Sequence, residues 1–300
     1  MMAVFPQSGC IAGPMSYYAI HLKNGTTIHF FGDYHDNMKN RCTGPRVIDI
    51  RIFLSRLKAP TVFVEAPPDS PIFWKEPTNM IRETMTACSE LHIDCAGVDL
   101  RAVHPIVRQV QAMYRTINGT LAEALHRPPA KIKQYREFAA TVAALSTPKA
   151  VTQVAWLACM SCFPDMPPKL RAWLHEERRS LEENVKGVMQ YEQCVATVIG
   201  ESAKATVSKR LRKAADDIAY FWLHVIAMLM DASVLYNVLK SRSKDIVVVV
   251  GAIHANACAS FFQTHDSKRV SQVVYRKDPQ TARKHVRCVC AKDLTTWVPS

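Results

Sequence analysis

The sequence predicts an α/β fold with a mostly parallel sheet, helices on both faces and a large helical insertion. In the first hundred residues, short β-rich runs alternate with stretches of helical spacing. Strand signals vanish from about residue 118 to about residue 211, and they return with the apolar run at 245–250. Continuous apolar runs are typical of strands buried on both faces, and their alternation with helices favours a layered α/β sheet.

The first elements follow in order. Residues 17–22 and 26–31 are β-rich, and the Asn-Gly pair between them is the strongest short signal for a hairpin. Residues 47–57 have the spacing of a helix, and the apolar run 61–64 is flanked by prolines. Together they predict a hairpin followed by a helix and a buried strand.

A second helix is predicted at 81–91 and a strand at 95–98, and a further helix begins near His104–Pro105, where proline suits the first turn. The stretch from about 118 to about 211 contains successive helical segments separated by prolines. Because the strand pattern resumes after it, we interpret this stretch as an insertion or cap within a single domain of residues 1–300.

The apolar stretch 218–239 is interrupted by polar residues, so its uninterrupted runs are shorter than the roughly 20 residues that a bilayer requires. We interpret it as a buried core helix and expect no membrane span. A strand at 245–250 and a helix through Phe262 follow, and strands at 270–275 and 285–289 are expected to form an antiparallel edge.

Composition excludes a disordered or fibrous chain, because 48% of the 300 residues are hydrophobic and only 21% are charged. The net charge of +12 attracts anions in general, including nucleic acid and phosphorylated metabolites. This charge is dispersed, and its densest run, Lys204–Lys213, is interpreted as the solvated face of a helix. Nucleic-acid binding is therefore not favoured.

Ten cysteines occur in a chain whose start has no basic segment followed by an apolar run. This predicts a cytoplasmic protein (in the host cytoplasm or the virion, if viral) with mostly reduced, buried thiols. The pairs Cys159–Cys162 and Cys288–Cys290 could supply four thiolates, but their spacing does not demand a zinc site.

Polar residues follow four predicted strands within a few positions. In open α/β sheets, ligands bind outside the carboxyl ends of the strands, so these residues are expected to converge on one site. They are Asp33, His35, Glu65, Asp99, Arg101 and His254.

Two of the strand ends carry the pattern Gly-x-x-His, at Gly32–His35 and Gly251–His254. Glycine allows the chain to turn sharply after a strand. Two imidazoles with nearby carboxylates suit a divalent zinc, manganese, iron or cobalt ion. The alternative for each histidine is an ordinary packing role.

A carboxylate that ends an apolar strand is costly unless it is paired or serves a site. Glu65 is therefore predicted to be a metal ligand or a general base, with a helix cap or an ion pair to Arg101 as the structural alternative. Arg101 would neutralise these carboxylates or hold a substrate carbonyl or carboxylate. Asp231, inside the apolar helix, is either a site carboxylate or a structural partner, and Asp99 is a further candidate.

The combination of Gly32-Asp33-Tyr34-His35, Glu65, Asp99-Leu100-Arg101 and Gly251–His254 resembles the superfamily of TraB and TIKI proteins, erythromycin esterases and ChaN-like proteins. With the helix that carries Asp231, it also looks like uncharacterised proteins of large DNA viruses. The resemblance implies an α/β fold with a site at strand ends. It further implies hydrolysis of an amide, peptide or ester in some members, with metal in the TIKI branch and haem in ChaN-like members.

By position, His35 and His254 match the two motif histidines and Glu65 matches the strand-end glutamate, while Asp33 stands where Glu is commoner. The resulting hypothesis is a metal-assisted hydrolase of a small-molecule or peptide substrate. Manganese, cobalt or zinc would bind both histidines and one carboxylate, the other carboxylate would be the general base, and Arg101 would stabilise the oxyanion.

Three alternatives stay open. A metal-free hydrolase would use a histidine as the base that activates water, as implied by the esterase relatives. A binding protein of the same fold would hold haem or a metabolite without catalysis. A basic viral factor would bind nucleic acid or a host protein, with the motif residues only holding the core.

Overall fold

The structure is a computed structural model of the 300-residue chain. It describes residues 10–33, 46–68, 80–100, 105, 108, 148–186, 209–274, 288–290 and 295–297. The chain divides into two compact units, one of residues 1–99 with 233–300 and one of residues 100–232.

The first unit contains a seven-stranded sheet in the order β10-β8-β2-β3-β7-β5-β6. Its strands along the chain are β2 (Ser16–Leu22), β3 (Thr27–Asp33), β5 (Thr61–Val64), β6 (Cys95–Gly97), β7 (Asp245–Gly251), β8 (Ser267–Val274) and β10 (Thr295–Trp297). Strands β3, β7, β5 and β6 are parallel to one another, and β2, β8 and β10 extend the sheet with antiparallel pairings. The fold is therefore α/β, with a parallel half and an antiparallel half in one sheet.

The hairpin between β2 and β3 confirms the prediction from the Asn-Gly pair. Gly25 has a φ of 84°, and its N–H donates to the carbonyl of Leu22 at 3.0 Å. The side chain of Asn24 accepts a hydrogen bond from the N–H of Thr26 at 3.0 Å. Glycine populates positive φ without steric cost, so this turn brings the two strands into register.

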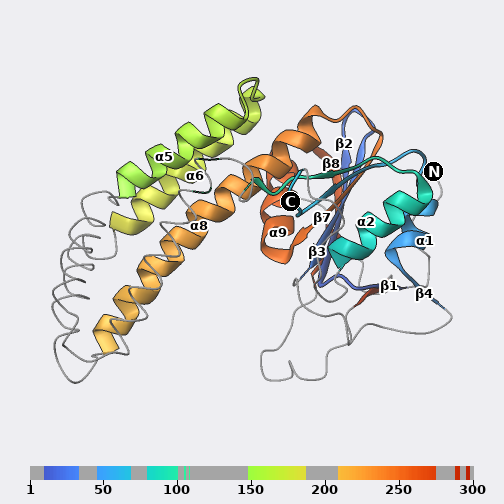
Figure 1. The fold of residues 1–300 in the computed structure, drawn as a ribbon, viewed down its shortest axis with the longest axis horizontal. Helices are drawn as coiled ribbons and strands as arrows, with labels where there is room; N and C mark the ends of the chain where they lie inside the picture. Colours follow the sequence, from blue (N-terminus) through green and yellow to red (C-terminus); the bar gives the residue numbers. More distant parts are fainter. Residues whose placement is uncertain are drawn as a thin grey trace. The chain divides into compact units, whose positions relative to one another are not determined.

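Helices cover both faces of the main sheet (Figure 1). They are α1 (Ile50–Ser55), α2 (Met80–Leu91) and α9 (Ala252–His265). Successive side chains of a strand point to opposite faces. Accordingly, Phe31 packs edge-on against Phe53 of α1, with ring centroids 5.1 Å apart, while its neighbour Phe30 packs against Phe262 of α9 at 6.1 Å.

A small second sheet has the order β4-β1-β9 and consists of β1 (Cys10–Ala12), β4 (Val47–Ile48) and β9 (Cys288–Cys290). The described part of the strand expected at 285–289 therefore belongs to this small sheet, while β10 forms the edge of the main sheet. The expected helix at 47–57 is also shorter. Its N-cap is Asp49, whose carboxylate accepts a 2.8 Å hydrogen bond from the N–H of Ile52, so the residues before it are free to pair as β4.

The second unit, as far as the structure describes it, is helical. Its elements are α5 (Pro148–Cys162), α6 (Pro168–Lys186) and α8 (Lys209–Lys240), the last of which contributes residues to both units. Helices α5 and α6 form a hairpin in which the rings of Trp156 and His175 lie 4.0 Å apart (Figure 1). The hydroxyl of Thr152 donates to Glu182 at 2.6 Å across the same pair. The rest of the predicted insertion at 118–211, and nearly all of the helix predicted from His104–Pro105, lie outside the described residues.

Helix α8 contains an 18-residue window, Leu223–Lys240, that is long and apolar enough to cross a membrane by composition. Within the described part of the chain it is the one such window, and 61% of it is buried inside the protein. Burial of this kind is expected for a core helix, and the buried residues of α8 include Leu229, Val234 and Leu235.

Candidate functional site

Three parallel strands end side by side at the predicted site. Asp33, the last residue of β3, pairs in register with Gly251, the last residue of β7. Glu65 follows the end of β5, which is the next strand along the sheet. Because parallel strands end at a common edge, the residues after β3, β7 and β5 lie at the same edge of the sheet.

Glu65 is fixed at this edge through both its main chain and its side chain. Its N–H donates to the carbonyl of Val249 at 3.0 Å, and its Oε2 accepts a 2.7 Å hydrogen bond from the N–H of Gly251. Gly251 is the N-cap of α9. A carboxylate beside the start of a helix is stabilised by the helix dipole, so the helix cap considered for Glu65 from the sequence is present.

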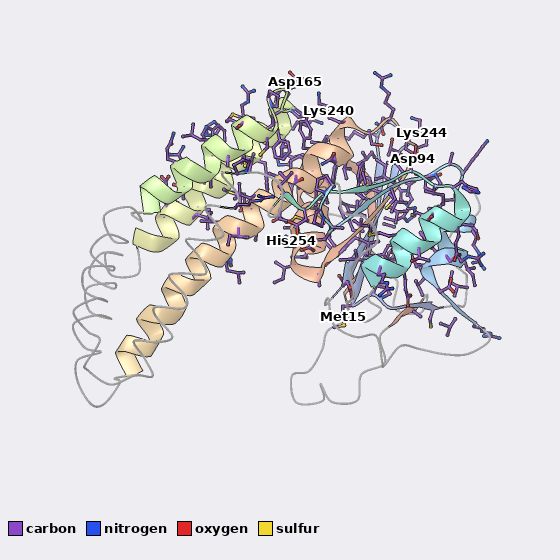
Figure 2. All side chains as sticks on the ribbon, in the orientation of Figure 1. Met15, Asp94, Asp165, Lys240, Lys244 and His254 are labelled. Atoms are coloured by element: carbon purple, nitrogen blue, oxygen red, sulfur yellow. The ribbon has the colours of Figure 1, made fainter. Side chains whose placement is uncertain are left out.

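The second carboxylate oxygen of Glu65 faces a histidine. His254, in the first turn of α9, places its Nε2 3.9 Å from Glu65 Oε1. This distance is too long for a direct hydrogen bond but within the range of an ion-pair contact. The Glu65 side chain is 3% exposed and that of His254 is 13% exposed, so a buried carboxylate lies behind an imidazole that solvent reaches. Figure 2 labels His254 at the start of α9.

The glycine of the first Gly-x-x-His motif permits a close backbone contact and does not form a turn. Gly32 lies within β3, and a Cβ there would stand 2.7 Å from the Cα of Ala252 and would also meet the hydroxyl of Ser16. Close approach between β3 and the first residue of α9 therefore requires glycine. This approach places Asp33, which is 1% exposed, beside the start of the helix that carries His254.

A similar close approach lies on the other side of Glu65. A Cβ at Gly97 would stand 2.7 Å from the carbonyl carbon of Pro67, and the N–H of Asp99 donates to the carbonyl of Ala66 at 2.9 Å. The chain after Glu65 is thereby held against the end of β6, and Asp99 is buried at 7% exposure. Sequence reasoning missed Gly97, although a glycine just before a polar strand end is the same signal as Gly32.

One exposed apolar residue at this edge was also missed. Ile253 precedes His254 in the first turn of α9 and is 71% exposed, which makes it a large hydrophobic side chain open to solvent. Its neighbour in the next turn, Asn256, accepts a 3.0 Å hydrogen bond from the hydroxyl of Tyr18, so α9 is tied to β2 at this point.

Three predicted site residues are not among those described at this edge of the sheet. His35 and Arg101 lie outside the described residues, and their predicted roles stay predictions. Asp231 belongs to the second unit, where it is buried at 5% exposure on α8. There, burial first and then the charge of Asp231 raise the pKa of Glu177 on α6.

The described residues supply part of the ligand set predicted for a metal ion. Over that part of the chain no group of three or more His, Cys, Asp or Glu side chains is arranged to hold a metal ion. Two predicted ligands do fit one ion, because the 3.9 Å between Glu65 Oε1 and His254 Nε2 is shorter than two zinc–ligand bonds. Two such bonds span about 4.2 Å.

The cysteine pair with the spacing of metal ligands lies on a helix. Cys159 and Cys162 are free thiols on α5. Burial is the main cause that raises their pKa values, to about 12 for Cys159 and about 11 for Cys162. Both are therefore protonated thiols at neutral pH. Elsewhere, Cys10 of β1 is disulfide-bonded, whereas the cysteines described as free thiols agree with the expectation of mostly reduced thiols.

Comparison with protein-family models, with curated proteins and with solved structures gives no match.

Proposed function

We propose that this chain hydrolyses an amide, peptide or ester bond at the sheet edge formed by Asp33, Glu65 and His254. The observation that carries the proposal is the bifunctional carboxylate of Glu65. Its Oε2 is held by the N–H of Gly251 at 2.7 Å, which leaves Oε1 directed at His254 Nε2 at 3.9 Å. Because one oxygen of the carboxylate is fixed and the other is directed at the imidazole, the two groups are positioned as an acid–base pair.

The separation of 3.9 Å suits a water molecule that contacts both groups, because each hydrogen bond spans about 2.8 Å. His254 takes a proton from this water, and the water oxygen attacks the carbonyl carbon of the substrate. The imidazolium then returns the proton to the leaving amine or alkoxide. Glu65 stabilises the imidazolium, and its own charge is stabilised by the N–H of Gly251 at the start of α9.

The metal-assisted form of the same reaction uses these residues differently. A divalent ion held by Glu65 and His254 would supply a bound water whose pKa lies near neutrality. His254 would then serve as a ligand, and the buried Asp33 at the neighbouring strand end would take the proton from water. The resemblance to TIKI proteins supports this form, and the resemblance to erythromycin esterases supports the metal-free one.

The exposed residue that precedes His254 suggests a class of substrate. Ile253, 71% exposed next to His254, offers an apolar contact for a substrate. Substrates with an apolar group beside the scissile bond are therefore expected to react faster than polar ones of the same size.

The experiment is a hydrolysis assay on the purified full chain. A panel of nitrophenyl esters, acyl-amides and fluorogenic peptides is tested with a chelator alone and with added manganese, cobalt or zinc. Turnover in chelator supports the metal-free form, and turnover that requires one of the ions supports the metal-assisted form. An absence of turnover with every substrate and ion would overturn the proposal and favour a binding protein of this fold.

A further inference from the structure

Two cysteines meet where α2 ends and β6 begins, away from the strand ends that form the candidate site. Cys88 lies near the end of α2 and is 1% exposed, whereas Cys95 is the first residue of β6 and is exposed. A tight turn joins them, in which the N–H of Ile93 donates to the carbonyl of Cys88 at 2.9 Å and His92 adopts a φ of 54°. Figure 2 labels Asp94, the residue between this turn and Cys95.

The turn brings the two sulfur atoms together. Both residues are free thiols, and their side chains share a hydrogen bond. Cys95 also pairs in register with Val62 of β5, so its backbone is held by the sheet while Cys88 is held by the core that packs on α2. The two thiols are therefore kept close by separate rigid elements rather than by the turn alone.

The two thiols differ in reactivity as well as in exposure. The hydrogen bond from Cys88 lowers the pKa of the Cys95 thiol, against the opposing effect of burial. The same hydrogen bond, together with burial, raises the pKa of the Cys88 thiol. The accessible sulfur is thus the better thiolate, which is the form that attacks electrophiles, and the buried sulfur stays protonated beside it.

We propose that Cys88 and Cys95 form a redox-active dithiol that an oxidised glutathione-type disulfide converts into an intramolecular disulfide. The Cys95 thiolate attacks one sulfur of the oxidant, its S–S bond breaks, and one glutathione thiolate leaves. Cys88 then loses its proton and attacks the sulfur of Cys95 in the mixed disulfide, which releases the second glutathione thiolate. The protein dithiol is oxidised by two electrons, and one oxidant disulfide is reduced to two thiols.

The sequence provides a direct readout. Trypsin cleaves after Arg82 and Arg101, so residues 83–101 form one peptide whose two cysteines are Cys88 and Cys95. A second peptide, residues 150–169, contains Cys159 and Cys162 as its cysteines and serves as an internal control. In this control pair burial raises both pKa values, so neither thiol is poised to attack.

The experiment equilibrates the native full chain in buffers of increasing oxidised-to-reduced glutathione ratio, blocks remaining thiols with an alkylating agent and measures both peptides. The 83–101 peptide is expected to lose both alkylation sites and two hydrogen atoms together, reversibly with dithiothreitol, before the 150–169 peptide changes. An 83–101 peptide that stays doubly alkylated after the control peptide has oxidised would overturn the proposal. So would a wild-type protein in which Cys95 stops at the mixed disulfide.

Two variants assign the order of attack. Cys88→Ala is expected to trap Cys95 as the glutathione mixed disulfide, and Cys95→Ser is expected to leave Cys88 reduced. Oxidation of Cys88 at the wild-type ratio in the Cys95→Ser protein would contradict the assignment of Cys95 as the attacking thiol. The wild-type peptide measurement does not depend on either variant folding normally, and it is independent of the proposed hydrolysis.

Discussion

The carboxylate of Glu65 joins the end of β5 to the end of β7, because its Oε2 accepts a 2.7 Å hydrogen bond from the N–H of Gly251. The two residues are 186 positions apart along the chain. This single contact orients the remaining oxygen toward His254, and it separates the two roles of Glu65. One oxygen accepts the hydrogen bond at the start of α9, and the other faces His254.

These two roles predict different outcomes for two substitutions. Glu65→Gln keeps a carbonyl oxygen that can accept from Gly251 but removes the charge beside His254. We expect the free energy of unfolding to change by less than about 1 kcal/mol while hydrolysis falls by about 100-fold or more.

Glu65→Leu is the matched comparison, because it removes the acceptor as well. Leaving the N–H of Gly251 without this acceptor costs about 1–3 kcal/mol. Urea denaturation of both variants measures the difference. Activity retained in the Gln variant would show that Glu65 is only a structural cap, and equal destabilisation by Gln and Leu would contradict the stabilising role of the hydrogen bond to Gly251.

Gly32→Ala is expected to destabilise the first unit by about 2 kcal/mol or more, because its Cβ would stand 2.7 Å from the backbone of Ala252. Gly25→Asn is the control. Gly25 has positive φ, but a Cβ at this position would meet nothing within 4 Å, and asparagine tolerates that backbone conformation. Thermal melts of the two variants are compared, and equal melting temperatures would contradict the close contact between β3 and α9.

Buried His29 predicts a loss of stability in acid. Its Nδ1 shares a 2.8 Å hydrogen bond with the hydroxyl of Tyr17, and burial first, then His21, lowers its pKa from 6.5 to about 3. Between these values the unfolded chain binds a proton that the folded protein does not. Stability is therefore complete above about pH 6.5 and falls as the pH drops toward 3, by roughly 3–5 kcal/mol in total.

The double variant Tyr17→Phe/His29→Leu removes both partners of this hydrogen bond at once, so neither is left buried alone. Its unfolding free energy is expected to vary less between pH 7 and pH 4 than that of the wild type. Urea titrations at a series of pH values test this. An unchanged pH dependence would mean that His29 is not held neutral in the folded protein.

Asp231 is expected to act on Glu177 in the helical unit. Since its charge is the second cause of the raised pKa of Glu177, after burial, Asp231→Asn should lower that pKa. Glu176→Gln removes a smaller cause and should lower it less. Carboxyl titration by NMR measures both shifts. If hydrolysis survives Asp231→Asn, Asp231 is a structural partner rather than a site carboxylate.

Several features of the fold and the site could be predicted from the sequence because they are local. The continuous apolar runs at 61–64 and 245–250 announce buried strands, and the residue that follows each run is placed by the strand itself. The Asn-Gly turn likewise depends on two adjacent residues.

Other features depend on neighbours that the sequence does not reveal. The direction of the Glu65 oxygens is set by β5 lying next to β7, which is a property of the strand order. Three-residue strands such as β1, β9 and β10 carry too little alternation to be distinguished from loops. The sulfur contact of Cys88 with Cys95 requires a turn with positive φ at His92. A residue other than glycine gives no sequence signal for this backbone conformation.

The most direct test of the central claim compares two histidines on one helix. His254 and His265 lie at opposite ends of α9, and His265 packs against the ring of Phe261, 5.0 Å away. For the best substrate of the panel, kcat/KM is measured for wild type, His254→Asn and His265→Asn. We expect His254→Asn to lower kcat/KM by about 100-fold or more, with an unchanged melting temperature, and His265→Asn to match the wild type. Equal activity in all three proteins would contradict the assignment of water activation to Glu65 and His254.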